Sequence, residues 1–596
     1  MTPLLHDRRP VLIAFVGPII AILSLLIGNV QSARLAHSQP VPLPRPLPET
    51  GVERLRPSPL PWADTPGFDF RMETPARTPV PRAIDELRFE LRAVVIEGST
   101  ALDGAALQAP FQSLIGQRIA LEDLRRAADG LEAAYRAKGY FLVRVVIPPQ
   151  RVREGRFVIR VIEGFVGNAS VEGGGESLRQ RIEAMLERVV GVRPVSLQAI
   201  ERELLLINDL PGVRARGTLR PGGSEGAVEL VVAADTAEDT STVSVNNHAS
   251  RNLGLWGYSA GILWRETLEG RGELTADFLG SGPEVMRAIA LRYAFPIGHS
   301  GTVAQIGALA ARARPFGSLR DDLGLDIESQ SRNLGIRLRY PLQRSRAESL
   351  FIEGGLTASQ SRTTGIPAPA CEAHLEPEIA DRVFTGEIGA VWLRAGPLSG
   401  RQEISLHVHR GLPTGWSYQG PDYSSACRQP GTAGFEPRFT RTLAQWTYLQ
   451  SFSSKLTATL SLRGQYTEDR LPTSERIAWG GARLGRAYDS GAVTGDRGYG
   501  ALIEIIWRTS PTRAATGLPP PQWFFFADHA YGKQLSSPSD PVTGGFIRLE
   551  SAGAGIRLTL ARPVSAELLI AKALRPVPSS DPRGDPRALI SLTGRF

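Results

Sequence analysis

The sequence predicts a transmembrane β-barrel of sixteen antiparallel strands preceded by two small α+β modules. Three observations predict it. The N-terminus resembles an export signal, and a β-α-α-β-β pattern occurs twice between residues 87 and 238. From residue 240 onward helical periodicity is absent, and segments of about 9–13 residues alternate apolar and polar side chains.

The N-terminal segment, residues 1–33, is interpreted as a signal peptide. "MTPLLHDRRP" is basic, "VLIAFVGPIIAILSLLIG" is apolar and "NVQSA" offers small residues for cleavage. A membrane anchor is the alternative, but Pro18 interrupts the apolar run and small residues follow it. Residues 34–86 form a spacer with twelve prolines between Pro40 and Pro81. Such a segment favours extended polyproline geometry, although it leaves room for a short plug helix.

Residues 87–164 and 165–238 are the two α+β modules. The stronger helix of the first module carries one apolar face, made of Leu121, Leu124, Ala128, Leu131 and Tyr135. Such modules can bind an extended chain along an exposed strand edge. We expect "YFLVRVVIPPQ" and "GAVELVVAAD" to supply these edges, unless they pair within their own modules.

Residues 240–596 form the predicted barrel. In "KLTATLSLRGQY" one face is apolar and the other carries lysine, threonine, serine, arginine and glutamine. A soluble sandwich also alternates, but long strands with a charged second face, aromatics near strand ends and alternating short and long connections favour a membrane barrel. An even strand count returns both ends to the periplasm. The alternation slips at "ESAGAGIRL", where we expect a glycine-rich bulge.

Composition and motifs argue against several functions. The formal charge is +8, from 68 Lys+Arg and 60 Asp+Glu, and the basic residues are scattered, so nucleic-acid binding is not expected. No catalytic triad or carboxylate pair has supporting spacing, and no cofactor or metal site is predicted. His407 and His409 share a strand face and are interpreted as polar groups of the lumen. Cys371 and Cys427 fall in successive outer loops and are candidates for a disulfide.

The order of these parts resembles the outer-membrane transporters of two-partner secretion, the hemolysin secretion/activation (TpsB) type within the Omp85 superfamily. The paired modules look like POTRA domains. In that family a loop between the eleventh and twelfth strands folds into the lumen and carries an Arg-Gly-aromatic motif, followed by a Gly-Asp-x-Gly-aromatic segment. Here "GRAY" and "GDRGY" match these motifs, with Ala487 in place of the usual glycine.

The resemblance implies a set of site residues. The lumen loop motif comprises Gly485, Arg486, Tyr488, Gly495, Asp496, Arg497 and Gly498. Its partner would be Asp528 in "FFFADHAYG", which we expect to pair with the guanidinium of Arg486 while Tyr488 packs beside it. A solvated loop arginine is the alternative for Arg486. Phe596, which ends the chain, would be the signal read by the barrel-assembly machinery.

The implied function is a pore in the bacterial outer membrane that moves one unfolded partner protein, of adhesin or hemolysin type, from periplasm to cell surface. The periplasmic modules would capture the partner in extended form, and arginines such as Arg337, Arg339 and Arg463 would line the conduit. Its contacts would be the secreted partner, outer-membrane lipid and the assembly machinery, and the protein would be a monomer. The alternatives are a barrel-assembly factor and, in a different class, a passive solute porin.

Overall fold

The computed structural model describes most of the region that follows the spacer. The described residues are 70–72, 88–151, 154–266, 272–282, 285–315, 327–364, 379–396, 400–417, 437–509, 518–535, 546–561, 563–577 and 585–596. The predicted signal peptide, most of the proline-rich spacer and both cysteines, Cys371 and Cys427, lie outside these ranges. Within them, no helix is both long enough and apolar enough to cross a bilayer.

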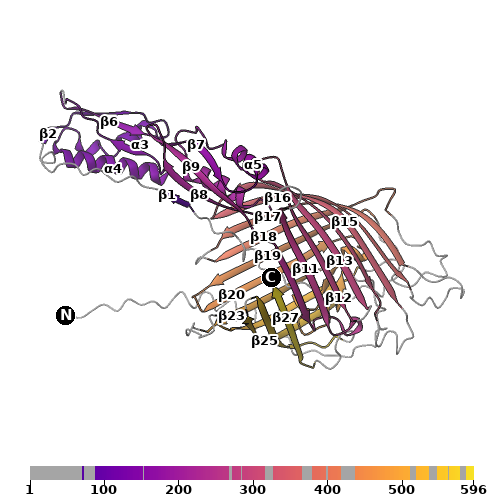
Figure 1. Cartoon of the computed structure of the whole chain (residues 1–596). Coiled ribbons are helices and arrows are strands. Elements are labelled where there is room, and N and C mark those ends of the chain that lie inside the picture. The colour runs from indigo at the N-terminus through magenta and orange to yellow at the C-terminus, as the bar shows by residue number, and fades with distance from the viewer. Residues whose placement is uncertain are drawn as a thin grey trace, which may run out of the picture. The chain divides into compact units, whose positions relative to one another are not determined.

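The C-terminal region is a closed barrel of sixteen strands, as predicted (Figure 1). Each strand pairs antiparallel with the next, and the first strand closes the barrel against the last. The first eight are β10 (Thr240–Asn246), β11 (Gly257–Glu266), β12 (Gly272–Ser281), β13 (Met286–Ile297), β14 (Thr302–Ala313), β15 (Glu328–Arg344), β16 (Glu348–Thr364) and β17 (Ile379–Ala395). The last eight are β18 (Arg401–Leu412), β19 (Thr440–Ser451), β20 (Leu456–Thr467), β23 (Arg497–Arg508), β24 (Gln522–Lys533), β25 (Phe546–Ala561), β26 (Val564–Ala573) and β27 (Arg587–Arg595).

The two-residue period of the strands decides which side chains face outward. On β15 the outward row is apolar and exposed: Leu334, Ile336, Leu338, Tyr340 and Leu342. On β20 the polar residues of the other phase, Thr457, Thr459 and Gln465, are buried inside. An apolar outer surface with a polar interior is the arrangement that a bilayer around the wall stabilises. The face assignment made from the sequence is therefore confirmed on these strands.

The chain terminus completes the barrel seam. Ser241 and Phe596 exchange two backbone hydrogen bonds, each of 2.8 Å. The side chains of Ile590, Leu592 and Phe596 are exposed on the outer surface, as the terminal alternation predicts. The role of Phe596 as an assembly signal stays a prediction.

The first α+β region packs one amphipathic helix against short strands. Its elements are β2 (Arg88–Glu90), β3 (Ala93–Glu97), α3 (Gly104–Gln108), a 3-10 turn (Gln112–Leu114), β4 (Arg118–Ala120), α4 (Leu121–Ala137), β5 (Arg144–Val146) and β6 (Arg156–Ile162). Leu124, Ala128, Leu131 and Tyr135 of α4 are buried, so most of the predicted apolar face is confirmed. The sheet order is β3-β6-β5, which leaves β5 at an edge.

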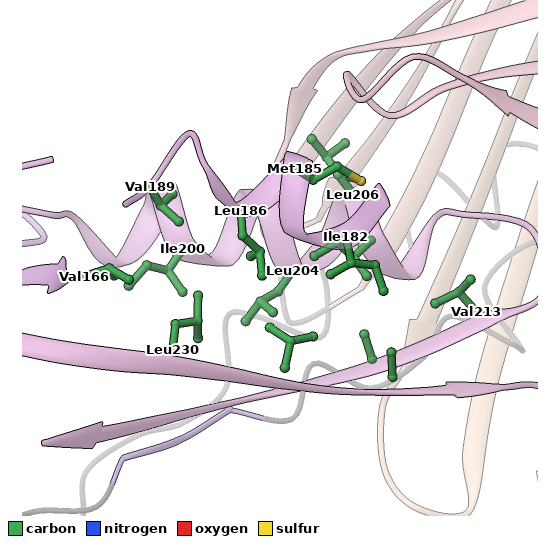
Figure 2. Close-up of a cluster of buried hydrophobic side chains, with 14 of the residues drawn as sticks. Val166, Ile182, Met185, Leu186, Val189, Ile200, Leu204, Leu206, Val213 and Leu230 are labelled. Carbon is green, nitrogen blue, oxygen red and sulfur yellow. The ribbon is translucent and has the colours of Figure 1, made fainter. Parts of the chain in front are cut away.

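The second α+β region has two helices on a four-stranded sheet. It contains β7 (Phe165–Glu172), α5 (Glu176–Leu186), α6 (Leu197–Asn208), β8 (Val213–Pro221) and β9 (Ala227–Thr236). Figure 2 shows the core between the helices and the sheet, where Ile182, Leu186 and Leu204 lie over Leu230. All four of these side chains are at most 1% exposed, so this region has a dry core of its own.

The sheet of the second region is completed by a segment from the spacer. β1 (Phe70–Met72) pairs parallel with β8, which gives the order β1-β8-β9-β7. β9 lies in the middle of this sheet with strands on both sides. The expectation that "GAVELVVAAD" offers a free edge is therefore wrong, because its backbone groups are already used by β8 and β7. A short extended piece of this same chain occupies the edge of β8 instead.

Candidate functional site

The candidate site is the long connection between β20 and β23, the eleventh and twelfth barrel strands. We call residues 468–496 the inner loop. It contains a 3-10 turn (Thr473–Glu475) and a small two-stranded ladder of its own, β21 (Ile477–Trp479) with β22 (Val493–Gly495). Most of the loop from Leu471 to Gly495 is buried. The predicted position of this loop, between the eleventh and twelfth strands, is correct.

Glycines allow the tip of the inner loop to turn sharply. Gly480, Gly481 and Gly485 have φ of +109°, +93° and +80°, conformations that other residues rarely adopt. Gly481 donates its N–H to the carbonyls of Gly485 and Tyr488, each at 3.2 Å. A Cβ on Gly480 would lie 2.1 Å from the carbonyl oxygen of Asp489, so the two sides of the tip approach too closely for any side chain there.

Arg486 lies at this tip and is 8% exposed. Its Nη2 is 2.8 Å from Oε2 of Glu504 on β23, its Nε donates to the carbonyl of Ala482 at 3.2 Å, and its guanidinium lies 4.4 Å from the ring centroid of Phe526. The predicted ion pair between Arg486 and Asp528 is therefore wrong, because the guanidinium pairs with Glu504 instead. Asp528 accepts the backbone N–H of Arg486 at 3.3 Å and the hydroxyl of Ser551 at 2.6 Å.

Arg486 and Asp528 are thus brought together, but by different atoms from those expected. Asp528 sits on β24, one strand beyond Glu504, and binds the loop backbone, while Glu504 neutralises the arginine. This division is physically reasonable, because a bent loop tip presents its N–H groups as well as its side chain. Two carboxylates on adjacent strands therefore clasp one residue of the inner loop.

Glu504 is a site residue that the sequence motifs do not identify. Glu504 also binds Arg557 of β25, because Nη1 of Arg557 lies 2.8 Å from Oε1 of Glu504. Arg557 in turn binds Glu567, with its Nε 2.6 Å from a carboxylate oxygen. The signal lies in "ALIEIIWRT", where one carboxylate interrupts an apolar strand in the inward phase. A buried carboxylate of this kind requires cationic partners, and counting inward charges on β23 would have identified it.

Tyr488 holds the loop tip against β25 and the segment that follows β26. The side chain is 0% exposed, and its hydroxyl lies 2.8 Å from the carbonyl oxygen of Glu550 and 2.7 Å from that of Arg575. The same hydroxyl accepts the N–H of Glu550 at 3.1 Å. Its neighbour Asp489 pairs with Arg587 of β27 at 3.0 Å. The tip therefore contacts strands from β23 to β27.

The "GDRGY" segment fixes the base of the inner loop. Asp496 is 1% exposed and accepts the N–H groups of Leu471 at 3.0 Å and Leu535 at 2.7 Å, and Arg476 Nε lies 3.2 Å away. A Cβ on Gly498 would lie 2.2 Å from the carbonyl oxygen of Tyr531. A Cβ on Gly495 would lie 2.8 Å from the nitrogen of Lys533, so neither position has space for a side chain.

Arg497 does not belong to the lumen. It lies on the outer face of β23, where its guanidinium is 5.9 Å from the ring of Tyr466, a side chain that is 57% exposed on the outer surface. Its place in the predicted lumen motif is wrong because the residue already belongs to the strand, in which alternate side chains point to opposite faces.

The wall beneath the inner loop is apolar, which is unusual for the inside of a barrel. We call this inward surface the apolar wall. It comprises Ile506, Phe524, Phe526, Ala530, Leu549, Leu569, Ala571, Ala573 and Leu589, which pack with Trp479, Ala487, Tyr488 and Val493 of the loop. Burial of such surfaces contributes about 25 cal/mol per Å². The loop is therefore held by packing as well as by charge.

Two glycines of β25 make room for this packing. A Cβ on Gly553 would lie 2.7 Å from the ring of Phe526, and one on Gly555 would lie 2.4 Å from the ring of Phe524. The bulge expected at "ESAGAGIRL" is absent from the β24–β25 pairing, and the register shift occurs later, between Thr559 and Ala561. These glycines accommodate the phenylalanine rings under Arg486 and Arg557.

The opposite side of the lumen is polar, and we call the inward surface of β15–β20 the polar wall. Arg339 Nε is 2.6 Å from Glu353, which also lies 2.9 Å from His407 Nε2. Arg337 binds Glu387, and His409 lies 3.6 Å from that carboxylate. The interpretation of both histidines as polar groups of the lumen is confirmed by these contacts. Among the described residues, no group of three or more His, Cys, Asp or Glu is placed to hold a metal ion.

Comparisons with known proteins agree with this geometry. Residues 226–557, more than half of the chain, match the family model described as haemolysin secretion/activation protein ShlB/FhaC/HecB, and residues 89–164 match the POTRA domain of ShlB type. The chain is 22% identical over 499 residues to the heme/hemopexin transporter protein HuxB of Haemophilus influenzae, covering 82% of this chain and 84% of that one.

Solved structures with the same fold include two CdiB proteins. CdiB from Escherichia coli superposes with a TM-score of 0.66 at 18% identity, covering 92% of this chain and 95% of that one. CdiB from Acinetobacter baumannii gives 0.60 at 15% identity, covering 100% of both. The chain therefore belongs to the ShlB/FhaC/HecB family of outer-membrane transporters, which are not enzymes and which use a β-barrel with periplasmic POTRA domains to secrete a partner protein.

Proposed function

We propose that this chain exports one partner protein in unfolded form, and that the inner loop keeps the resting lumen obstructed. The observation that carries the proposal is the clasp at the loop tip, where Arg486 is buried between Glu504 and Phe526 and its N–H reaches Asp528. A loop that served only as a surface connection would not bury an arginine inside the barrel. The exported partner would be a protein of adhesin or hemolysin type.

Opening the pore would require the tip to leave the apolar wall. Removing one partner from a buried ion pair typically destabilises by about 3–5 kcal/mol, because the other charge is left uncompensated. Glu504 would keep Arg557 as a partner after release of Arg486, since Arg557 binds its other oxygen. The charge left on the wall is therefore smaller than in an isolated pair, which makes the clasp suitable for repeated opening.

The periplasmic regions would capture the partner as an extended strand. Support comes from β1, because a three-residue segment of the spacer already pairs in parallel with the edge of β8. The same edge could accept an incoming chain through main-chain hydrogen bonds, which demand little of its sequence. In the first region, β5 is the edge strand that "YFLVRVVIPPQ" contributes.

Surface proteomics tests the exported class of protein. A strain lacking this chain should lose one large surface protein while its other outer-membrane barrels remain at normal levels. Complementation with the wild-type chain should restore that protein. Complementation with Arg486→Gln should in addition leave the pore open at rest, measured as increased sensitivity to an antibiotic too large for ordinary porins, because the buried charge pair that holds the loop tip is lost. Arg497→Gln is the matched control, since it changes an arginine of the same motif that faces outward.

Three results would contradict the proposal, the first two as a whole and the third in its account of the gate. General loss of barrels from the outer membrane in the deletion strain would identify an assembly factor. Normal surface proteins combined with impaired uptake of a small solute would identify a porin. Equal antibiotic sensitivity of the Arg486→Gln and wild-type strains would leave secretion intact as the function but reject the clasp as its gate.

A further inference from the structure

The outer surface of the barrel carries a concentration of arginines beside its apolar band. One arginine from each of five consecutive strands, β13 to β17, faces outward, and all five are exposed: Arg287, Arg312, Arg332, Arg362 and Arg382. We call them the arginine belt. None of the five belongs to the inner loop, to its partners on the wall or to the periplasmic regions.

Strand direction places the belt at the outer end of the barrel. β10 leaves the periplasmic regions, so the fourth, sixth and eighth strands, β13, β15 and β17, run toward the periplasm. Arg287, Arg332 and Arg382 lie near the beginnings of these strands. Arg312 and Arg362 lie near the ends of β14 and β16, which run outward. All five are therefore near the outer end of the barrel wall.

The pairing of the strands makes the belt continuous. Arg287 is directly opposite Arg312, which is opposite Gln330, and Gln330 is opposite Arg362. Below this row, Gln360 lies between Arg332 and Arg382. Residues directly opposite each other share a face, and like charges in such positions destabilise a sheet. An anion bound beside Arg287 and Arg312 would therefore stabilise this part of the sheet.

Acidic side chains are scarce among the described residues of this face. Among the described residues at the outer ends of β13–β17, Glu328 is the one outward-facing acid, and it binds Arg312 at 2.6 Å and Arg314 at 2.7 Å. Arg332 has no ion pair with any described residue. On the inward face of the same strand, by contrast, Arg337 and Arg339 each bind a glutamate. Arginines thus outnumber carboxylates in the described part of the belt, whereas the two signs are matched on the inside of β15.

The apolar neighbours identify the environment of the belt. Arg332 directly continues the outward row of β15 that contains Leu334 and Ile336, which are 59% and 43% exposed. Arg382 similarly precedes Phe384 and Ile388 on the outward face of β17. A group at this boundary meets the headgroups of the outer leaflet, where the bacterial lipid is a glycolipid with phosphate groups on its sugars. Guanidinium groups bind phosphates through paired, directional hydrogen bonds.

We propose that the arginine belt binds the phosphate groups of lipopolysaccharide in the outer leaflet, through its lipid A portion. Bound glycolipid would place phosphate groups beside the exposed guanidinium groups and hold this side of the barrel at a fixed depth in the membrane. Basic residues next to a bilayer typically recognise anionic headgroups in this way. The partner is the lipid itself and not a free anion, because the row continues without interruption into lipid-facing side chains.

Thermal unfolding of the full chain in detergent micelles tests the proposal. Bisphosphorylated lipid A should raise the unfolding midpoint of the wild-type protein, whereas lipid A stripped of both phosphates should not. Replacing all five belt arginines by glutamine should weaken the apparent affinity for lipid A by at least about 100-fold, given the usual contribution of each basic residue at an anionic surface. Replacing them by lysine should retain most of the affinity, because the charge remains.

Arg394→Gln provides the matched control. Arg394 is also an outward, exposed arginine of β17, but it lies at the periplasmic end beside Trp392 and opposite Glu348. Its substitution should leave lipid A binding unchanged. Retention of the heat-sensitive electrophoretic shift of folded barrels shows that each variant is folded. If the fivefold variant does not fold, the double variant R332Q/R382Q should still show a loss of about tenfold.

Three outcomes would overturn the proposal. The first is equal stabilisation of the wild type and the folded glutamine variants by lipid A. The second is an equal effect of the dephosphorylated lipid, which would indicate binding through acyl chains alone. The third is the same midpoint shift with inorganic phosphate at matched concentration, which would indicate a general anion effect.

Discussion

The two walls of the lumen are built from the same kind of strand but carry different chemistry. The polar wall on β15–β20 presents serine, threonine, glutamine and charged side chains, and its Glu353 and Glu387 are both bound to arginines. The apolar wall on β23–β27 presents leucine, isoleucine, alanine and phenylalanine, and among them a few charges that bind the inner loop. A water-filled passage requires the first surface, whereas a docked loop requires the second.

The contrast indicates that the two walls of the barrel have different roles. A chain moving along the polar wall would meet glutamates that already have cationic partners, and so would bind weakly. The inner loop finds on the apolar wall both packing and partners of opposite charge, so it binds in one position. Substitutions at the apolar wall or in the inner loop should therefore have larger effects than comparable substitutions elsewhere in the barrel, and three pairs of variants and one single substitution test this difference.

The largest effect is expected for Glu504→Gln. Glu504 holds two cations, Arg486 and Arg557, so its neutralisation should release the loop tip at a cost of about 3 kcal/mol and raise the open fraction by about 100-fold. Single-channel recordings in planar bilayers would measure this as prolonged open events. Glu387→Gln on the polar wall is the matched control, since Glu387 also binds two groups, Arg337 and His409, and should leave the channel closed.

A smaller effect is expected for Gly553→Ala. The new Cβ would lie 2.1 Å from the carbonyl oxygen of Ile570 and 2.7 Å from the ring of Phe526, so strand and ring must both shift. We expect a loss of about 1–3 kcal/mol in barrel stability, measured as a lower thermal midpoint. Gly307→Ala on β14 should be nearly neutral, because the nearest atom would be 3.8 Å away. Equal losses at both positions would mean that the phenylalanine rings are not closely packed.

Tyr488→Phe should have a moderate effect. The substitution leaves the N–H of Glu550 and the carbonyl of Arg575 without the partner that the phenol supplies, which typically costs about 1–3 kcal/mol. Protease cleavage within the inner loop should become faster, while the barrel itself stays resistant. Tyr466→Phe serves as the control, because its hydroxyl contacts Glu468 on the exposed outer face. Unchanged cleavage in Tyr488→Phe would show that this hydroxyl does not hold the tip.

The smallest effect is expected for Glu353→Gln on the polar wall. Loss of this carboxylate leaves Arg339 and His407 without their acidic partner, so the lumen becomes more positive. The open channel should shift its ion selectivity toward anions, which a reversal potential under a salt gradient would detect. Secretion should remain within about twofold of wild type, because the partners of Glu353, Arg339 and His407, belong to the polar wall and not to the inner loop. Strong loss of secretion here would show that the polar wall binds the passenger.

Several features of the site could be predicted from the sequence because they depend on local period and chain order. Counting strands places "GRAY" between the eleventh and twelfth, and the two-residue period places Arg337 and Arg339 inside. The partner of Arg486 could not be predicted in this way. Glu504 and Asp528 are both inward and on adjacent strands, and only the path of the loop tip decides which one meets the guanidinium and which the backbone.

The glycines of β25 show the same limit. In the sequence "ESAGAGIRL" is compatible with a bulge, but in the structure Gly553 and Gly555 lie beneath Phe526 and Phe524 of the neighbouring strand. The cross-strand register places each glycine beneath a phenylalanine ring, and this register is set by the whole sheet. The prediction that "GAVELVVAAD" forms a free edge is wrong for a similar reason, because β1 and β7 occupy the outer positions of that sheet.

Alternation and chain order were enough to specify the barrel, its strand number, the inward and outward phases and the position of the inner loop, because each of these is written locally along the chain. Contacts between residues distant in sequence required the folded barrel: Arg486 with Glu504, Tyr488 with Glu550, and one arginine beside the next around the outer rim. These contacts depend on closure of the barrel, which brings strands into a common register that no single segment encodes.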